Sequence, residues 1–106
     1  MQNITLPSGL RVVGSGAFQS CLALKRVQLN DGLETLGENC FMNTGLAGVD
    51  VPRSVREVGD GAFWKCKGLA HANIPRDGGL RRIGLRAFSE TALESFQAPD
   101  GLAELA

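Results

Sequence analysis

The chain lacks a net charge, a long apolar run and a set of metal-binding side chains. Its eleven basic and eleven acidic residues cancel, which removes the long-range field that a nucleic-acid-binding protein usually carries. No apolar stretch approaches the roughly 18 residues of a membrane-spanning helix, and no signal-peptide pattern opens the chain. One histidine and three cysteines without a Cys-x-x-Cys spacing do not predict a zinc site. We therefore expect no nucleic acid, no metal or other cofactor, and no transmembrane segment.

What the chain has instead is a repeated phrase, Gly-x-x-Ala-Phe, with cysteine replacing alanine in the second of four copies. The phenylalanines lie 23, 22 and 25 residues apart, at Phe18, Phe41, Phe63 and Phe88. Such a period indicates stacked repeats, none of which can bury its apolar face alone. We therefore predict a single solenoid domain over 1–106, with about 4.5 repeats of 22–25 residues. The units are approximately 1–23, 24–45, 46–68 and 69–92, with a partial unit at 93–106.

Each unit has two halves with different patterns. The first half reads Leu-x-x-Val-x-Leu-Pro, and its alternation of apolar and polar residues predicts a half-buried strand. In the second copy, Val27 and Leu29 face the core, whereas Arg26 and Gln28 face outward. The second half, Leu-x-x-Val-Gly, predicts a shorter strand on the other side of the coil. We expect its glycine to turn the chain sharply and the Ala-Phe pair to begin a helical or 3-10 turn that fills the core.

The charges favour stacking in register. One column of the aligned units contains Val12, Thr35, Glu57, Arg82 and Glu104, so that opposite charges are neighbours. The preceding column places Arg11, Glu34 and Arg56 together in the same way. Each cross-strand pair contributes only about 0.2–1 kcal/mol. These pairs therefore favour one register more than they stabilise the fold.

The unit resembles the BspA-like class of leucine-rich repeats, most closely from Val51 to Cys66, and the resemblance covers essentially the whole chain. It implies an α/β-type curved solenoid with a parallel β-sheet along one face, and short strands with 3-10 or helical turns on the other. It also implies a binding role, often at cell surfaces, and provides no catalytic residues. Because the chain starts and stops within a unit, without capping repeats, we expect a fragment of a longer array or covered ends.

The three cysteines are predicted to be buried, unpaired thiols. Cys21 and Cys66 occupy the same position two units apart, which separates them by roughly 9–10 Å in stacked strands. A disulfide requires Cα atoms closer than about 7 Å. Cys40 lies four places earlier in its unit, so that a bond to either neighbour would be strained. Reduced thiols fit the cytoplasm and the family fits a cell surface, so the compartment stays open.

The outward-facing side chains of the longer strands are the predicted binding surface. Their mixed charges and amides suit a protein or glycan partner, and the tentative binding residues are Arg26, Gln28, Asp50, His71, Asn73 and Gln97. His71 lies near Asp50 and Ser95 in this alignment, but a flat strand ladder supplies neither an activated nucleophile nor an oxyanion hole. We therefore predict a module that is not an enzyme.

Trp64 is a further candidate for binding. It follows the buried Phe63, in a column expected to point outward beside Met42, and tryptophan is enriched at interaction hot spots. The alternative is that Trp64 lies across its neighbours and shields the core. An alternative function is also open, namely a structural spacer or an array that associates end to end, because exposed strand edges pair readily with other chains.

Overall fold

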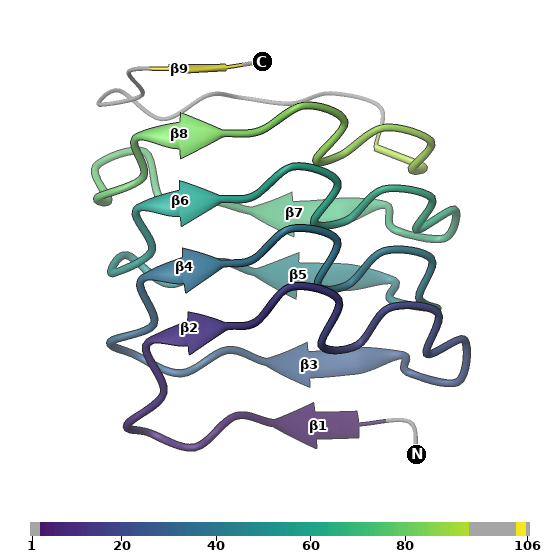
Figure 1. Ribbon diagram of the computed structural model, residues 1–106, viewed down its shortest axis with the longest axis horizontal. Helices are drawn as coiled ribbons and strands as arrows, with labels where there is room; N and C mark the ends of the chain where they lie inside the picture. Colours follow the sequence, from purple (N-terminus) through teal and green to yellow (C-terminus); the bar gives the residue numbers. More distant parts are fainter. Residues whose placement is uncertain (1–2, 94–103, 106) are drawn as a thin grey trace.

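The computed structural model describes residues 3–93 and 104–105, which form a parallel β-solenoid of about four turns (Figure 1). These residues contain short strands and no helix. The strands are β1 (Asn3–Thr5), β2 (Val12–Val13), β3 (Arg26–Gln28), β4 (Thr35–Leu36), β5 (Gly48–Asp50), β6 (Glu57–Val58), β7 (His71–Asn73), β8 (Arg82–Ile83) and β9 (Glu104–Leu105).

The two strands of each turn belong to different sheets, whose strands run in opposite directions (Figure 1). The two-residue strands β2, β4, β6, β8 and β9 form one continuous parallel sheet. The three-residue strands form two separate parallel pairs, β1–β3 and β5–β7. The continuous sheet is therefore made by the short strands, whereas the layer of longer strands is interrupted between β3 and β5.

The predicted register is confirmed in both layers. Asn3 pairs with Arg26 across β1 and β3, and Gly48 pairs with His71 across β5 and β7. In the short-strand sheet the aligned column runs through Val12, Thr35, Glu57, Arg82 and Glu104, as the sequence alignment predicts. The pairing of these strands thus follows the period of the repeated phrase.

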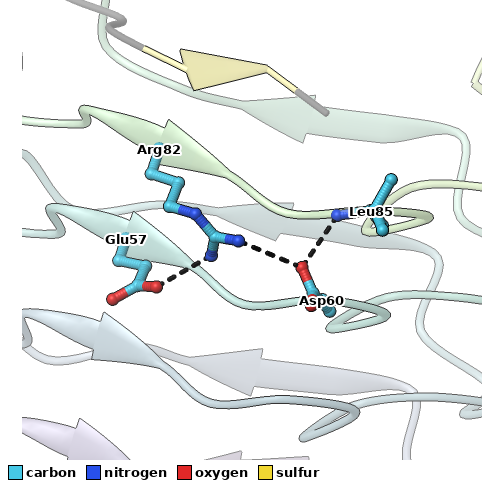
Figure 2. Close-up of polar contacts among 4 residues, drawn as sticks. All are labelled: Glu57, Asp60, Arg82 and Leu85. Atoms are coloured by element: carbon cyan, nitrogen blue, oxygen red, sulfur yellow. Dashed lines mark hydrogen bonds and ion pairs between the residues drawn. The ribbon is translucent and has the colours of Figure 1, made fainter.

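One predicted charge column forms ion pairs and the other does not. Figure 2 shows the Arg82 guanidinium between two carboxylates, 2.9 Å from Glu57 Oε2 and 3.4 Å from Asp60 Oδ1. Asp60 Oδ1 also accepts a hydrogen bond from the Leu85 N–H at 2.9 Å. Arg11 and Glu34, both within 3–93, stack in register through their backbones but form no ion pair. The shared register therefore does not depend on a salt bridge at every level.

The phenylalanine column forms the centre of the core. The four rings stack nearly parallel, with centroid separations of 5.2, 5.5 and 5.3 Å from Phe18 to Phe88. Phe41 and Phe63 are completely buried, whereas the two end rings are partly exposed. Leu, Val and Ile side chains from both strand layers pack around this column. The prediction that phenylalanine fills the core is confirmed.

The prediction that the Ala-Phe pair begins a helical turn is wrong. In a helix the N–H groups beyond the first turn bond to carbonyls within the segment, but here the N–H groups alternate between two kinds of partner. One set donates to the carbonyl three residues back, as in a β-turn: Ala17, Gln19 and Cys21. The other set donates to carbonyls of the next coil: Gly16, Phe18 and Ser20. If the segment formed a helix, these hydrogen bonds to the next coil would be lost.

Left-handed backbone conformations recur within these turn segments and also exclude a helix. Gly16 and Ser20 have φ values of 66° and 63°. The corresponding pairs in the later units are Asn39 and Asn43, Gly61 and Lys65, and Arg86 and Glu90. A positive φ at the third position of a β-turn is characteristic of type II. The repeated phrase therefore encodes a series of turns.

The glycine that begins the repeated phrase is required for a different reason from the sharp turn that the sequence predicted. A turn requirement predicts positive φ at Gly37, Gly59 and Gly84, but none of them adopts it. Instead, a Cβ at Gly59 would lie 2.8 Å from Leu36 O and 2.9 Å from the Glu38 N of the preceding coil. Gly14, in the first turn of the coil, has no such neighbour within 4 Å. These glycines are required because consecutive coils approach closely.

The prediction of buried cysteines holds for two of the three. All three are free, Cys40 and Cys66 are buried, and Cys21 is exposed. The Cys66 thiol lies 3.0 Å from Phe41 O and 3.2 Å from Thr44 Oγ1, both of which belong to the preceding unit. Cys21 occupies the same position in the first unit and has no such contacts among the described residues. Burial at this position therefore depends on the neighbouring coil.

Candidate binding groove

A groove lies on the layer of longer strands, where no ladder joins β3 to β5. Its main part has a volume of about 510 Å³ and is lined by residues of β1, β3 and β5 and of the segments that follow them. A second hollow of about 250 Å³ lies beside it, toward the start of β5 and β7. Binding sites for small ligands commonly have volumes of about 300–1,000 Å³. The groove is therefore large enough to hold several side chains.

We attribute the interruption to a shorter connection before β5. Phe41 precedes Leu46 by five residues, whereas six residues separate Phe18 from Leu24 in the unit before. A Cβ at Gly45, within this connection, would lie 2.5 Å from Leu22 O. Among the described residues, one backbone hydrogen bond joins the segment before β5 to the segment before β3, from Ala47 N–H to Lys25 O at 3.4 Å. The next pair of longer strands begins with a bond of 3.0 Å and forms a ladder.

The groove brings together five of the predicted binding residues. Arg26, Gln28 and Asp50 line the main part. His71 and Asn73 line the second hollow, to which Arg26 and Asp50 also contribute. All five are exposed, and the Asn73 Nδ2 donates a hydrogen bond of 2.6 Å to Asp50 Oδ1. Gln97 lies outside the described residues.

Trp64 does not line the groove. It belongs to the turn segment after β6, and its Nε1 donates to Glu90 Oε2 at 3.1 Å. The Lys65 Nζ lies 4.9 Å from the ring centroid and the Arg86 Cζ lies 5.3 Å from it, both in cation–π geometry. The half-buried ring is thus held among charged side chains.

Sequence reasoning missed two charged residues that line the groove. Lys25 immediately precedes β3, and Asp31 lies in the turn after it. The alternation of the strand identifies only outward-facing residues within the strand itself, so residues at its two ends have no assigned direction. The signal that was available is their position beside Arg26 and Gln28, whose side chains were assigned to the binding face.

The described residues hold no cluster of metal-binding side chains, and one of their buried thiols has a raised pKa. Among residues 3–93, no group of three or more His, Cys, Asp or Glu side chains could hold a metal ion. Burial raises the pKa of the Cys40 thiol to about 12, which keeps it protonated at neutral pH. A protonated, buried thiol is a poor nucleophile and a poor metal ligand.

Comparison with known proteins places this fold in a family. The whole chain, residues 1–106, matches the family model for the BspA type leucine-rich repeat region, in six copies. The chain therefore belongs to the BspA-type leucine-rich repeat family. No curated protein matches the chain. In the part of the chain that the structure describes, no helix is long and apolar enough to cross a membrane.

Solved structures of leucine-rich repeat proteins are similar over nearly the whole chain. A leucine-rich repeat protein of T. pallidum is 33% identical, with a TM-score of 0.89, over 97% of this chain and 50% of its own length. A leucine-rich repeat protein of Bacteroides ovatus is 27% identical with a TM-score of 0.77, over 100% of this chain and 30% of its own. The pneumococcal vaccine antigen PcpA, at 23% identity and a TM-score of 0.90 over 98% of this chain and 26% of its own, shows the same fold. This chain thus spans half or less of these proteins.

Proposed function

We propose that the chain is a non-catalytic binding module that contacts a protein partner through the groove between β3 and β5 and the adjoining face of β7. The leucine-rich repeat fold suggests a binding or scaffold module, and proteins of this family and fold are typically not enzymes. The observation that carries the finer proposal is the convergence of Arg26, Gln28, Asp50, His71 and Asn73 on this groove.

The chemistry of the groove favours a protein over a phosphate backbone. Basic and acidic side chains both line it, alongside the amides of Gln28 and Asn73. Binding to nucleic acid depends mainly on many basic contacts to phosphates, which Asp31 and Asp50 would oppose. Charged and amide groups together are suited to the mixed surface of a folded protein or an extended peptide. A glycan is the alternative ligand with comparable hydrogen-bonding groups.

Selection from a library of random displayed peptides tests this proposal, with the folded chain as bait. The key variant is Gly48→Arg, which places a bulky cation in the second hollow. A Cβ at Gly48 would meet only His71, at the ordinary contact distance of 3.6 Å, so that the variant is expected to fold. The matched control is Gly9→Arg, the same substitution at an exposed turn position with no neighbour within 4 Å.

The proposal predicts that peptides selected by the wild-type chain bind the Gly9→Arg variant normally and lose at least about tenfold in affinity for Gly48→Arg. Retention of binding by Gly48→Arg would place the binding surface elsewhere. A glycan array probed with the same three proteins examines the alternative ligand class. Binding of glycans alone, lost only in Gly48→Arg, would keep the groove and replace the protein partner.

The second candidate function is self-association as a structural array. Val12 and Leu22, near the start of the coil, are exposed apolar residues, at 53% and 62%. Sedimentation velocity over a range of concentrations tests this directly. Two results together would favour the structural role over the binding module: a concentration-dependent oligomer that Leu22→Gln abolishes, and a peptide library from which the chain selects no binder.

A further inference from the structure

The charged side chains that line the groove are separated by sign along the strand direction. At the start of the strands lie Lys25 and Arg26 of the β3 segment. At the end of the strands lie Asp50, the last residue of β5, and Asp31, in the turn after β3. The groove therefore has a basic end and an acidic end.

These charges are available to a ligand. Within residues 3–93, Lys25, Arg26 and Asp31 form no ion pair, in contrast to Arg82 in the short-strand sheet. Asp50 uses one carboxylate oxygen to accept the Asn73 amide, and its other oxygen has no partner among these residues. Arg53, just beyond the acidic end, is paired with Asp77 at 2.8 Å. It therefore adds no net charge there.

We propose that the groove binds an extended peptide segment that carries an acidic side chain at the basic end and a basic side chain at the acidic end. This inference rests on the proposed function and specifies the partner chemistry of the same groove. Complementary charges determine both the preference for such a peptide and its orientation in the site.

The dimensions of the groove set the spacing of the two charges in the ligand. Arg26 lies at the level of Gly48, two residues before Asp50, which corresponds to roughly 7 Å at 3.3 Å per residue. Asp31 follows Arg26 by five residues, and because it lies in the turn after β3 the separation is at most roughly 17 Å. An extended ligand therefore presents its opposite charges about two to five residues apart. Between the two ends, the Gln28 amide can donate to and accept from the ligand backbone.

The ligand lies on the outer face of the groove. No ladder joins β3 to β5, but the two strands remain neighbours and are linked by the bond from Ala47 N–H to Lys25 O. A further strand cannot fit between them, since each strand pair needs about 4.8 Å. The ligand therefore contacts the side chains that line the groove and the charges at its two ends.

Calorimetric titration with short blocked peptides of about six residues tests the inference. The parent peptide carries one Glu and one Lys, about three residues apart, in a Ser/Thr/Gly background, and it is made in both orders. Three companions replace Glu, Lys or both with Gln. Each is titrated into the wild-type chain and into Arg26→Gln and Asp50→Asn, both of which change exposed side chains and preserve the fold.

The inference predicts that one of the two orders of Glu and Lys along the peptide binds more tightly than every other peptide. Loss of either charge should weaken binding by up to about fivefold, as for exposed ion pairs of about 1 kcal/mol. In Asp50→Asn, replacing the peptide's Lys with Gln should no longer weaken binding, whereas replacing its Glu still should. In Arg26→Gln the reverse is expected. Equal affinities for the parent peptides and their three companions, or no binding of any peptide, would overturn this inference. The proposed function is judged separately, by whether library-selected peptides distinguish Gly48→Arg from Gly9→Arg.

Discussion

Replacing Gly59 with alanine should destabilise the solenoid because the added methyl group has no room between consecutive coils. A Cβ at this position would lie 2.8 Å from Leu36 O, where ordinary contacts begin at 3.4 Å. The two coils would have to separate by about 0.6 Å at this point. The Gly59 N–H bonds the same Leu36 oxygen at 2.7 Å, so that the separation also weakens a hydrogen bond between coils.

The magnitude follows from these two effects. Overpacking of this kind costs about 1–3 kcal/mol, and the weakened hydrogen bond about 0.5–1.5 kcal/mol. We therefore expect Gly59→Ala to lower the free energy of unfolding by about 2–4 kcal/mol, equivalent to a fall in Tm of about 10–25 °C for a chain of this size. The matched control is Gly14→Ala, which has nothing within 4 Å of the added methyl group.

Equilibrium unfolding in urea measures both variants, with the fluorescence of the single Trp64 and circular dichroism as independent probes. Gly14→Ala should be neutral or stabilising by up to about 1 kcal/mol, since alanine restricts the unfolded chain. A Gly59→Ala protein as stable as the wild type would refute the conclusion that close approach of coils requires these glycines. Equal destabilisation by both variants would restore the turn requirement that the sequence first suggested.

Other predictions concern the core and the thiols. Phe63→Ala should lower the free energy of unfolding by about 3–5 kcal/mol, because Phe63 is completely buried between two stacked rings. Phe18→Ala, at the partly exposed end of the stack, should lower it clearly less. Equal losses of stability in urea unfolding would contradict this description of the column. Under native conditions, a thiol reagent should modify Cys21 alone, with Cys40 and Cys66 reacting only after unfolding. Mass spectrometry follows the reaction, and rapid modification of all three cysteines would contradict the described packing. Because burial raises the pKa of Cys40 from 9.0 to about 12, its contribution to stability is complete below pH 9 and is lost as the pH rises toward 12. Cys40→Ala, which restores the residue of the other three units, should reduce this alkaline loss, and an unchanged pH dependence would show that another group causes it.

The repeated pattern made the architecture predictable. The spacing of Phe18, Phe41, Phe63 and Phe88 fixed the turns of the coil, and alternation within the longer strands identified which side chains face outward. In-register stacking then aligned Glu57 with Arg82, whose side chains form the predicted ion pair. These features depend on periodicity, which a sequence displays directly.

The features that were mispredicted depend on contacts between neighbouring coils. The sequence predicts a helical or 3-10 turn beginning at Ala17 and Phe18, but donation of alternate N–H groups to the next coil favours β-turns instead. Cys21 and Cys66 share a position in the repeat and differ in burial because their neighbours differ. The effect of neighbouring units is not visible in the sequence of one unit.

The candidate site was predictable in its residues and not in its shape. Five outward-facing side chains could be assigned to one face, but that face was expected to be a continuous strand ladder. The missing residue between Phe41 and Leu46 was visible in the sequence. Its consequence, an interrupted sheet with a groove between β3 and β5, required the three-dimensional arrangement. The charged residues Lys25 and Asp31 join the candidate site only because they line this groove.

The most direct test of the central claim, that the groove between β3 and β5 is the binding surface, is NMR mapping of the ¹⁵N-labelled chain with a library-selected peptide. Binding in the groove predicts that the largest amide shift changes fall on Arg26, Gln28, Asp50 and Asn73. The short-strand sheet, including Glu57 and Arg82, should change little. Shift changes centred on Trp64 and its neighbours Lys65 and Arg86, with none along β3 and β5, would contradict the account.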